Sequence, residues 1–384
     1  MIKRASCKKH IEAALGRSRA VALLGPRQCG KTTLAREIVD IHAPNYFDLE
    51  DPSSLMGLTD PKSALSSLKD IVVIDEVQRR PDLFPILRVL LDRKPLPAKF
   101  LILGSASPDL LRQSSESLAG RLETIELGGF GLSEVGQKQA ARLWLRGGFP
   151  LSFLANNDAD SFAWRKSFIQ ALLERDLRQQ GIDIPSVAMY RFWYMLAHSH
   201  GQIWNAAPFA TSLGISEPTV RRYLDILTGL FMIRQIQPWH VNIKKRQVKA
   251  PKIYIRDTGL LNSLLGIKAE ADILRHPSCG ASWEGYVIEE IIHSVEPDDI
   301  YYWATHNGAE IDLVLFKDGR MYGFEVKRND APTMTPSMRV ALEDLKLERI
   351  AVVYPGDRRY ELHKKIAVVP FEQITGGIKT IFEL

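Results

Sequence analysis

A glycine-rich stretch with one lysine and two threonines contains the first residues whose types and spacing could do chemistry. Residues 25–32 read GPRQCGKT and match the spacing G-x-x-x-x-G-K-[ST]. Glycines at this spacing let the backbone curl until several N–H groups face one anionic centre, and the N-terminus of a following helix adds partial positive charge. We therefore expect a phosphate-binding loop that consists of Gly25, Pro26, Arg27, Gln28, Cys29, Gly30, Lys31, Thr32 and Thr33.

The segments on either side of this loop have the pattern that a phosphate-binding loop requires. Residues 20–24 read AVALL, a short apolar run typical of a buried strand, and the residues after Lys31 have apolar side chains at helical spacing. In this context Lys31 would contact the outer phosphates and the Thr32 hydroxyl would bind Mg²⁺. Arg27 would hold the loop or a neighbouring acid. The alternative is a glycine turn with an unrelated lysine.

A second buried strand that ends in two carboxylates would supply the acidic partners of such a loop. Residues 71–76 read IVVIDE, four β-type apolar residues followed by Asp75 and Glu76. Because parallel strands place ligand-binding residues at their carboxyl ends, we expect both acids beside the nucleotide. Asp75 would hold Mg²⁺ through water, and Glu76 would polarise the attacking water. The alternative is an ordinary strand end with two solvated acids.

Two further residues are candidates for contacting the terminal phosphate. A third strand-like run, residues 99–107, reaches Gly104 and Ser105, and a polar side chain there could sense the γ-phosphate. Arg121, in the stretch SLAGRLETIEL, is a candidate arginine finger that acts within its own subunit or on a neighbouring one. The alternatives are a strand-ending turn and an ordinary surface arginine.

Four charged residues near the C-terminus have the types and the order of a metal-dependent phosphodiesterase site. Glu284 lies in a helix-like segment, Asp312 in an alternating strand-like run, and Glu325 and Lys327 on one face of the next such run. This order resembles the PD-(D/E)xK nuclease core. There Asp312 and Glu325 would bind one Mg²⁺, Glu284 would complete the ligands, and Lys327 would orient or deprotonate the attacking water. The alternatives are half-exposed strands, or a core that survives only as a binding scaffold.

The middle of the chain has the pattern of a winged helix-turn-helix. Residues 207–214 predict a short helix closed by a glycine, Ser216 can cap a second helix, and a β-type run follows. The second helix would expose Arg221 and Arg222. A wing-like loop nearby would carry Lys244, Lys245, Arg246 and Lys249. One interpretation is contact with the phosphates of DNA or RNA; the other is that the module packs between domains.

The chain contains, in this order, the motifs GPRQCGKTTLA, IVVIDEVQRRPDLFPILRVLLD, LILGSAS and SLAGR. They resemble those of a family of prokaryotic AAA-type ATPases whose C-terminal domain of unknown function has a restriction-endonuclease-like part. GGFP at 147–150 and PKIYIRDTGLLNSLLG at 251–266 resemble later markers of that family, so the resemblance spans nearly the whole chain. It implies the fold and the use of ATP, but no particular substrate. Cys29 stands where a small aliphatic residue is usual; because cysteine is also small and apolar, we expect no loss of ATP binding.

Length and composition narrow the class of protein. The 384 residues exceed the size at which one hydrophobic core keeps growing, so two or three domains are expected. Hydrophobic residues make up 45% of the chain and charged residues 25%, and the net charge of +5 permits a nucleic-acid partner without arguing for one. No apolar stretch approaches the roughly 18 residues of a membrane span. We therefore expect no membrane partner. The three cysteines are few and lie far apart, which fits the reducing cytoplasm better than a disulfide framework.

The expected fold class is α/β. A P-loop AAA-type ATPase domain is predicted at 1–148, a helical and winged-helix region at 149–275, and a restriction-endonuclease-like α/β domain at 276–384. Three functions remain open: an ATPase coupled to a nucleic-acid-directed module, a regulatory ATP switch that binds a protein partner and cuts nothing, and a nuclease whose ATPase serves only assembly. ATP and Mg²⁺ are the expected cofactors, and a homo-oligomer is required if Arg121 acts on a neighbouring subunit.

Overall fold

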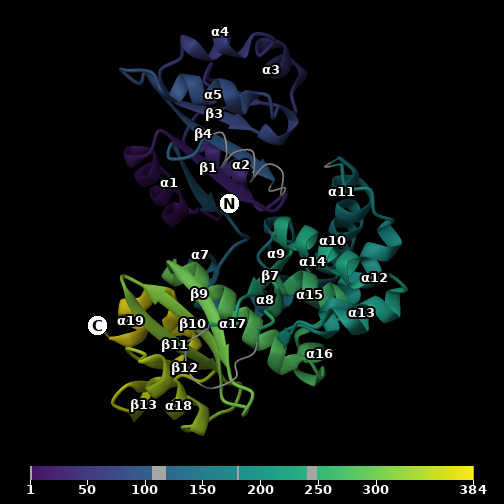
Figure 1. Ribbon diagram of the computed structural model, residues 1–384, viewed down its shortest axis with the longest axis vertical. Coiled ribbons are helices and arrows are strands. Elements are labelled where there is room, and N and C mark those ends of the chain that lie inside the picture. Colours follow the sequence, from purple (N-terminus) through teal and green to yellow (C-terminus); the bar gives the residue numbers. More distant parts are fainter. Residues whose placement is uncertain (1, 106–117, 180, 240–248, 384) are drawn as a thin grey trace. The chain divides into compact units, whose positions relative to one another are not determined.

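The computed structural model describes residues 2–105, 118–179, 181–239 and 249–383 of the chain (Figure 1). Packing divides the chain into two compact units, one of Met1–Phe130 with Gly229–Phe231 and the other of Gly131–Thr228 with Met232–Leu384. The boundaries of the three domains given above stay a prediction.

The first unit is built on a parallel sheet of five strands in the order β2-β3-β4-β1-β5 (Figure 1). The strands are β1 (Ala20–Gly25), β2 (Tyr46–Asp48), β3 (Asp70–Asp75), β4 (Ala98–Ser105) and β5 (Leu122–Glu126). Every neighbouring pair is parallel, so all five carboxyl ends lie at one edge of the sheet. The glycine loop after β1, the acids at the end of β3 and the end of β4 therefore meet at the same edge.

Helices cover both faces of this sheet, which explains why its strands are continuously apolar. The helices are α1 (Ala5–Arg17), α2 (Lys31–Arg36), α3 (Pro52–Gly57), α4 (Pro61–Ser66) and α5 (Leu83–Leu91). On one face, Leu23 lies in a hydrophobic cluster with Leu15 of α1 and Leu34 of α2. On the other face, Leu24 lies in a cluster with Leu87 of α5. Successive residues of β1 thus enter opposite halves of the core.

The helix after the glycine loop is shorter than its apolar spacing predicts. The apolar side chains at helical spacing after Lys31 are Leu34, Ile38 and Val39, but α2 ends at Arg36. The N–H groups of Ile38 and Val39 both donate to the carbonyl oxygen of Ala35 at 2.9 Å, and the chain turns out of the helix. Both side chains still pack against the cluster on that face of the sheet. The prediction of a helix after the loop is thus confirmed for Lys31–Arg36, and the helical spacing beyond it corresponds to a turn.

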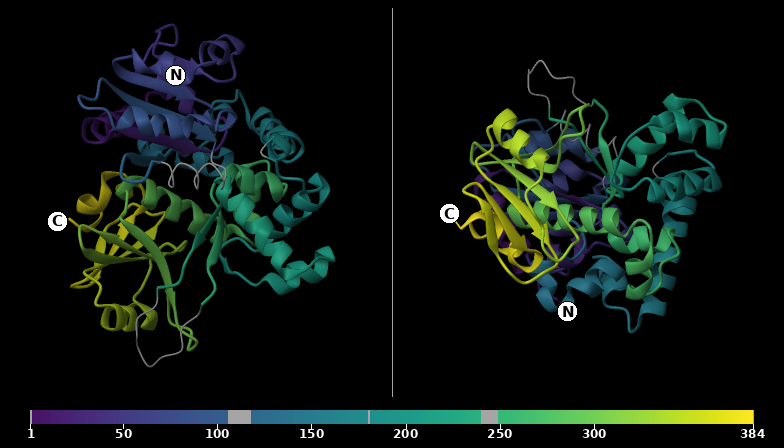
Figure 2. Two further views of the ribbon diagram at one scale, coloured as in Figure 1. Left: turned by 45° about the horizontal axis from the view of Figure 1, so that its top comes forward. Right: turned by 90° about the horizontal axis from the view of Figure 1, so that it is seen from below.

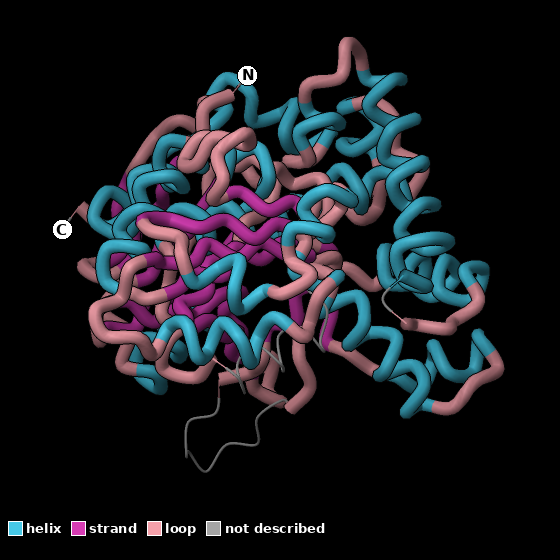
Figure 3. Tube along the Cα trace, turned by 90° about the horizontal axis from the view of Figure 1, so that it is seen from above, coloured by secondary structure: helices cyan, strands magenta, loops and turns pink. Residues whose placement is uncertain are grey.

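The second unit begins with a region that is nearly all helical, drawn as cyan tubes in Figure 3. Its helices are α7 (Leu132–Val135), α8 (Ala140–Arg146), α9 (Pro150–Phe153), α10 (Asp158–Ala171), α11 (Leu177–Gln179), α12 (Ser186–His198), α15 (Thr258–Leu264) and α16 (Glu270–Arg275). A π-helical turn, Leu172–Asp176, joins α10 to α11. Arg165 of α10 is fully buried and donates to the carbonyl oxygens of Leu145 at 3.0 Å and Gly259 at 2.8 Å. This arginine ties α10 to α8 and α15.

Two helices joined by a glycine turn, and a strand after them, occur where the sequence predicts them, whereas the short strand before them was not predicted. α13 (Ala206–Leu213) ends at Gly214, whose φ is 66°, and α14 (Glu217–Gly229) follows Ser216, whose hydroxyl accepts the N–H of Thr219 at 3.3 Å. An antiparallel sheet in the order β6-β8-β7 is formed by β6 (Gln202–Ile203), β7 (Ile233–Ile236) and β8 (Lys252–Ile255). Of the basic residues predicted for a wing, Lys249 is exposed, whereas Lys244, Lys245 and Arg246 lie outside the described residues.

The C-terminal part of the second unit is a six-stranded mixed sheet in the order β13-β14-β12-β11-β10-β9, green to yellow in Figure 2. The strands are β9 (Asp299–Ala304), β10 (Glu310–Lys317), β11 (Arg320–Val326), β12 (Ile350–Tyr354), β13 (Tyr360–His363) and β14 (Ile366–Pro370). The accompanying helices are α17 (Cys279–Val295), α18 (Pro336–Leu345) and α19 (Gly377–Phe382). Strands β9, β10 and β11 are antiparallel, and β11, β12 and β14 are parallel. Met338 of α18 lies in one cluster with Val314 and Val352, so this helix packs on the sheet.

Candidate functional site

The predicted phosphate-binding loop lies between β1 and α2, at the carboxyl edge of the parallel sheet. Gly30, directly before α2, has a φ of 102°, a left-handed conformation that favours glycine. The Lys31 side chain is buried, and its Nζ donates to the carbonyl oxygens of Gly25 at 2.9 Å and Pro26 at 2.7 Å. The ammonium group therefore lies inside the curve of the loop, where it is placed to contact an anion held by the loop N–H groups.

Close packing beneath the loop fixes its path. A Cβ at Gly25 would lie 2.0 Å from the carbonyl oxygen of Leu127, so no larger residue fits without a shift of the backbone. The Cys29 thiol is fully buried and donates to the same oxygen at 3.3 Å. Arg4 donates from Nη1 to the carbonyl oxygens of Cys29 at 3.2 Å and Gly128 at 3.1 Å. This buried arginine clamps the loop to the segment after β5, and its local sequence does not distinguish it from the other N-terminal basic residues.

Asp75, at the end of β3, faces the loop. Burial raises the pKa of Asp75, which is only 1% exposed, and hydrogen bonds from Thr32 and Tyr46 act in the opposite direction. The Tyr46 hydroxyl donates to Oδ2 at 3.0 Å. A threonine hydroxyl beside a carboxylate supplies the oxygen donors that Mg²⁺ prefers, so Thr32 and Asp75 fit this ion. The sequence did not predict Tyr46, which reaches the site from β2.

Glu76 follows Asp75 in a strained backbone conformation. Its φ of 57° is left-handed, which is uncommon for a residue with a side chain and concentrates at functional sites. Burial raises the pKa of Glu76, while the positive charges of Lys31 and, more weakly, Arg27 lower it. The positive charges of the loop therefore act on this carboxylate, and Gln78 donates a hydrogen bond to it. An acid in this position, with a pKa above its ordinary value, is suited to accept a proton from a water molecule.

The other two residues predicted for this site, Ser105 and Arg121, lie at opposite edges of the sheet. Ser105 ends β4 and pairs with Gly25, so its backbone lies beside the loop, and its side chain is outside the described part of the structure. Arg121 directly precedes β5, which starts opposite Ala20, and donates from Nε and Nη2 to Asp92 at 2.7 and 2.9 Å. Because the amino edge of a parallel sheet is far from the loop, this placement contradicts a within-chain role for Arg121. A role on a neighbouring subunit stays a prediction.

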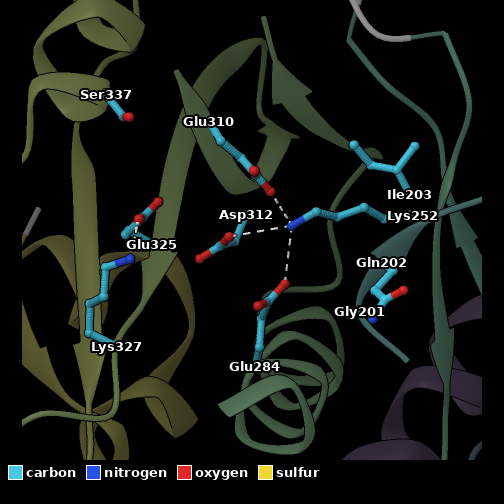
Figure 4. A pocket seen from close by; sticks show the side chains of 10 residues that line it. All are labelled: Gly201, Gln202, Ile203, Lys252, Glu284, Glu310, Asp312, Glu325, Lys327 and Ser337. Atoms are coloured by element: carbon cyan, nitrogen blue, oxygen red, sulfur yellow. Dashed lines mark hydrogen bonds and ion pairs between the residues drawn. The ribbon is translucent and has the colours of Figure 1, made fainter. Parts of the chain in front are cut away.

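The C-terminal residues predicted as a metal site lie together around one pocket of about 500 Å³ (Figure 4). Glu284 comes from α17, Asp312 from β10, and Glu325 and Lys327 from the end of β11. The other residues that line the pocket are Gly201, Gln202, Ile203, Lys252, Glu310 and Ser337. The structure thus brings the four predicted side chains together from three elements, and their chemical roles stay a prediction.

Asp312 and Glu325 carry the oxygen atoms that best fit a divalent cation. Asp312 Oδ2 accepts the N–H of Val326 at 2.9 Å, which fixes the carboxylate, and Lys327 Nζ lies 2.6 Å from Glu325 Oε1. Glu325 Oε2 is buried and has no hydrogen-bond partner among the residues that the structure describes. Burial, followed by the charge of Asp312, raises the pKa of Glu325 to about 8. A buried oxygen without a partner, next to a second carboxylate, suits a cation such as Mg²⁺.

Lys252 lines the pocket and Tyr254 contacts one of its acids, and neither residue was predicted from the sequence. Tyr254 donates its hydroxyl to Glu284 Oε1 at 2.5 Å, and Lys252 Nζ lies 3.2 Å from the same oxygen and 3.5 Å from Asp312 Oδ1. Lys252 also forms an ion pair with Glu310. Burial acts to lower the pKa of Lys252, but the surrounding acidic groups hold it well above its usual range. Burial, followed by the charge of Asp312, raises the pKa of Glu284 to about 7.

Three family models match successive parts of the chain. Residues 17–136 match an AAA domain, residues 137–271 match a domain of unknown function (DUF8612), and residues 279–374 match another domain of unknown function (DUF4143). The AAA match contains the glycine loop and both acids at the end of β3. The match to DUF4143 contains Glu284, Asp312, Glu325 and Lys327.

Two curated proteins are similar along the whole chain. They are the uncharacterized proteins Rv2008c of Mycobacterium tuberculosis and Mb2031c of Mycobacterium bovis, each 51% identical over 387 residues, which covers 100% of this chain and 88% of the relative. Among solved structures, the Walker-type ATPase PABY2304 of Pyrococcus abyssi is 18% identical, with a TM-score of 0.49, and the similarity covers 69% of this chain and 96% of that one. Within the described ranges, no helix has both the length and the apolar character needed to span a bilayer.

Proposed function

Because the chain belongs to the family of AAA-domain proteins that includes the two mycobacterial relatives, we propose that it is a Mg²⁺-dependent ATPase. The observation that carries this proposal is the buried ammonium group of Lys31 inside the glycine loop, with Asp75 and Glu76 following β3 at the same carboxyl edge of the sheet. Thr32 and Asp75 would hold Mg²⁺, which would neutralise charge on the outer phosphates. Lys31 contacts these phosphates, and Glu76 takes a proton from the attacking water.

The test of this proposal separates ATP binding from ATP hydrolysis. Replacement Lys31→Ala should abolish ATP binding, because the only ammonium group inside the loop is lost. Replacement Glu76→Gln should lower kcat by about 100-fold or more while ATP binding remains, because a general base contributes roughly 10²–10⁴. The matched control is Glu50→Gln, an exposed acid of the same unit. Unchanged hydrolysis in Glu76→Gln would contradict the role of this residue.

We further propose that the C-terminal pocket binds a divalent cation and cleaves phosphodiester bonds of DNA or RNA. The convergence of Glu284, Asp312 and Glu325 on one pocket supports this, as does the buried Glu325 oxygen without a partner among the described residues. Asp312 and Glu325 would hold the cation, which would stabilise charge on the scissile phosphate. Lys327, 2.6 Å from Glu325, orients the attacking water. Coupling to the nucleotide state of the first unit is part of this proposal.

Cleavage assays on DNA and RNA with Mg²⁺ or Mn²⁺ test the second activity. The intact chain should cleave at least one of these substrates, and Asp312→Asn and Lys327→Met should each remove cleavage while ATP hydrolysis continues. The control is Glu361→Gln, an exposed acid on β13. A change in cleavage rate with ATP supports coupling, and the same rate with and without ATP supports an ATPase that serves only assembly.

A second candidate function is a regulatory ATP switch that binds a protein partner through an inactive nuclease-like scaffold. The observation that favours it is the ammonium group of Lys252, which already pairs with Glu284, Glu310 and Asp312 in the pocket. In this case the intact chain would cleave neither DNA nor RNA under any divalent cation, while its ATPase activity would be normal.

Contact with nucleic acid is proposed for the exposed face of α14. Arg221 and Arg222 are exposed there, in the second helix of a pair that we interpret as a winged helix-turn-helix. A plot of the logarithm of the binding constant against the logarithm of the salt concentration has a negative slope, and each lost phosphate contact should make it less steep by about 0.9. Double replacement of the two arginines by Ala should therefore flatten the slope. An unchanged slope would assign this module to packing instead.

A further inference from the structure

The pocket of the second unit contains more negative than positive charge. Its ionisable side chains are those of Glu284, Glu310, Asp312, Glu325, Lys252 and Lys327. When all six are charged, the four carboxylates and two ammonium groups leave two net negative charges. One divalent cation would neutralise this excess, whereas two such cations would leave the pocket positive. The charge count therefore fits a single bound metal ion.

The two ammonium groups divide the pocket into two parts (Figure 4). Lys252 Nζ takes the first part, 3.2 Å from Glu284 Oε1 and 3.5 Å from Asp312 Oδ1, and it also pairs with Glu310. The second part contains Glu325, whose Oε1 pairs with Lys327 and whose Oε2 has no hydrogen-bond partner in the described residues. Asp312 lies between the two parts. The carboxylate oxygen without a partner among the described residues thus belongs to the part with Glu325, whereas the acids of the other part already pair with an ammonium group.

Lys252 is held in place by the backbone on both sides. It lies on β8, the central strand of its sheet, and pairs with Ile236 of β7 and Ile203 of β6. The residue is 4% exposed, and its ammonium group lies 5.8 Å from the centre of the Tyr302 ring. Moving this ammonium group out of the pocket would break its ion pairs with Glu284, Glu310 and Asp312 and leave these acids without their cation. An incoming metal ion therefore does not readily displace it.

We propose that Lys252 is a built-in cation that occupies the position of a second metal ion, so that this pocket binds one divalent cation, held by Asp312 and Glu325. The inference rests on the proposed metal site of the second unit. It assigns Lys252 a positioning role: its ammonium group fixes Glu284 and Glu310 and supplies the positive charge that a second ion would bring. The ligand class is a single hard divalent cation with oxygen ligands.

The number of Mn²⁺ ions bound by the intact, nucleotide-free chain tests the proposal, measured by electron paramagnetic resonance. The chain carries Asp75→Asn, which removes a predicted metal ligand of the first unit. One tightly bound Mn²⁺, lost in the further variant Asp312→Asn, supports the proposal. Two bound ions overturn the inference about Lys252 and leave the metal site intact. No bound ion overturns the proposed metal site itself, and the inference falls with it.

Substitution of the lysine gives a second and independent readout. Replacement Lys252→Gln should raise the number of bound Mn²⁺ ions from one to two, because Glu284, Glu310 and Asp312 lose their internal cation. Replacement Lys252→Arg keeps the charge and should bind one ion. A single ion bound more tightly by Lys252→Gln overturns the proposal, because the lysine would then compete for the same position as the metal. If Lys252→Gln does not fold, the number of Mn²⁺ ions bound by the chain with native Lys252 still tests the proposal.

Discussion

The hydroxyl group of Tyr46 donates a hydrogen bond to Asp75 Oδ2 at 3.0 Å. A side chain from β2 thus holds an acid that stands at the end of β3, and the Thr32 hydroxyl of α2 also acts to lower the pKa of this acid. Asp75 is almost fully buried, and burial alone would favour its protonated form. The hydroxyl groups therefore oppose the effect of burial and favour the charged form that a metal ligand needs, although the pKa of Asp75 stays above its ordinary value.

Replacement Tyr46→Phe should weaken Mg²⁺-dependent ATP hydrolysis. A hydrogen bond to a charged group is worth about 1.5–3 kcal/mol, so kcat/KM for Mg-ATP should fall by about tenfold or more. In the native chain the hydrogen bond from Tyr46 lowers the pKa of Asp75. Without it the carboxyl group stays protonated to a higher pH, so the loss of activity should grow as the pH falls. ATPase rates across pH measure this. The control Tyr223→Phe removes a hydroxyl from a buried tyrosine of the other unit; matching pH profiles for Tyr46→Phe and the native chain would contradict the role.

Replacement Gly25→Ala should damage both ATP binding and stability. The new Cβ would lie 2.0 Å from the carbonyl oxygen of Leu127, so the loop or the segment after β5 must move. Overpacking of this kind costs about 1–3 kcal/mol in the free energy of unfolding. The matched control is Gly57→Ala, where a Cβ meets nothing within 4 Å. Denaturant unfolding and ATP titration measure the two effects. An alanine at 25 that binds ATP normally would show that the loop is not fixed by this contact.

The sequence predicted those parts of the first site that depend on local pattern. The spacing of the glycine loop predicted the position of Lys31 and Thr32, and the apolar run before the two acids predicted that of Asp75 and Glu76. In the structure all four lie at the same edge of the sheet. Tyr46 and Arg4 were not predicted. Each contacts the site from a distant part of the chain, and a local sequence pattern does not show such contacts. The position of Arg121 could not be predicted either. Its motif is recognisable, but only the direction of β5 in the sheet shows that it lies at the edge with the amino ends of the strands.

In the second unit, alternation along each strand predicted that Glu325 and Lys327 share one face, and the resemblance to a nuclease core implied that Asp312 lies with them. It did not predict Lys252, which reaches the same pocket from a different sheet. The available signal is the sequence KIYI, which places a lysine and a tyrosine on one face of an otherwise apolar strand. A buried lysine requires acidic partners, but the sequence does not say which acids these are.

Replacement Arg121→Ala tests whether this arginine acts on a neighbouring subunit. Within its own chain Arg121 pairs with Asp92, so Asp92→Asn is the matched control that breaks the same pair. If Arg121 completes a neighbouring ATP site, Arg121→Ala should lower kcat by roughly 10³-fold without loss of ATP binding, and Asp92→Asn should retain most of the rate. Mixing Arg121→Ala chains with Glu76→Gln chains should then restore part of the hydrolysis. Equal, small effects of the two single replacements would assign Arg121 to the ion pair alone.

Glu290 of α17 is a buried acid at the start of another helix. Its Oε2 accepts the N–H of Leu132, the first residue of α7, at 2.8 Å. Burial raises the pKa of Glu290 from 4.5 to about 8, although the hydrogen bond acts in the opposite direction. The folded state therefore binds a proton on this group more tightly than the unfolded state does.

Replacement Glu290→Gln should reduce the dependence of stability on pH. In the native chain the contribution of Glu290 is fully present below pH 4.5 and is lost as the pH rises towards about 8, because the unfolded carboxyl ionises first. Each tenfold change in proton affinity is worth about 1.4 kcal/mol, so the variant should gain a few kcal/mol relative to the native chain between pH 5 and pH 8. Glutamine keeps an acceptor for the N–H of Leu132. Denaturant unfolding at both pH values measures the effect, with the exposed Glu361→Gln as control; parallel pH dependence in Glu290→Gln and the native chain would show that Glu290 is ionised in the folded state.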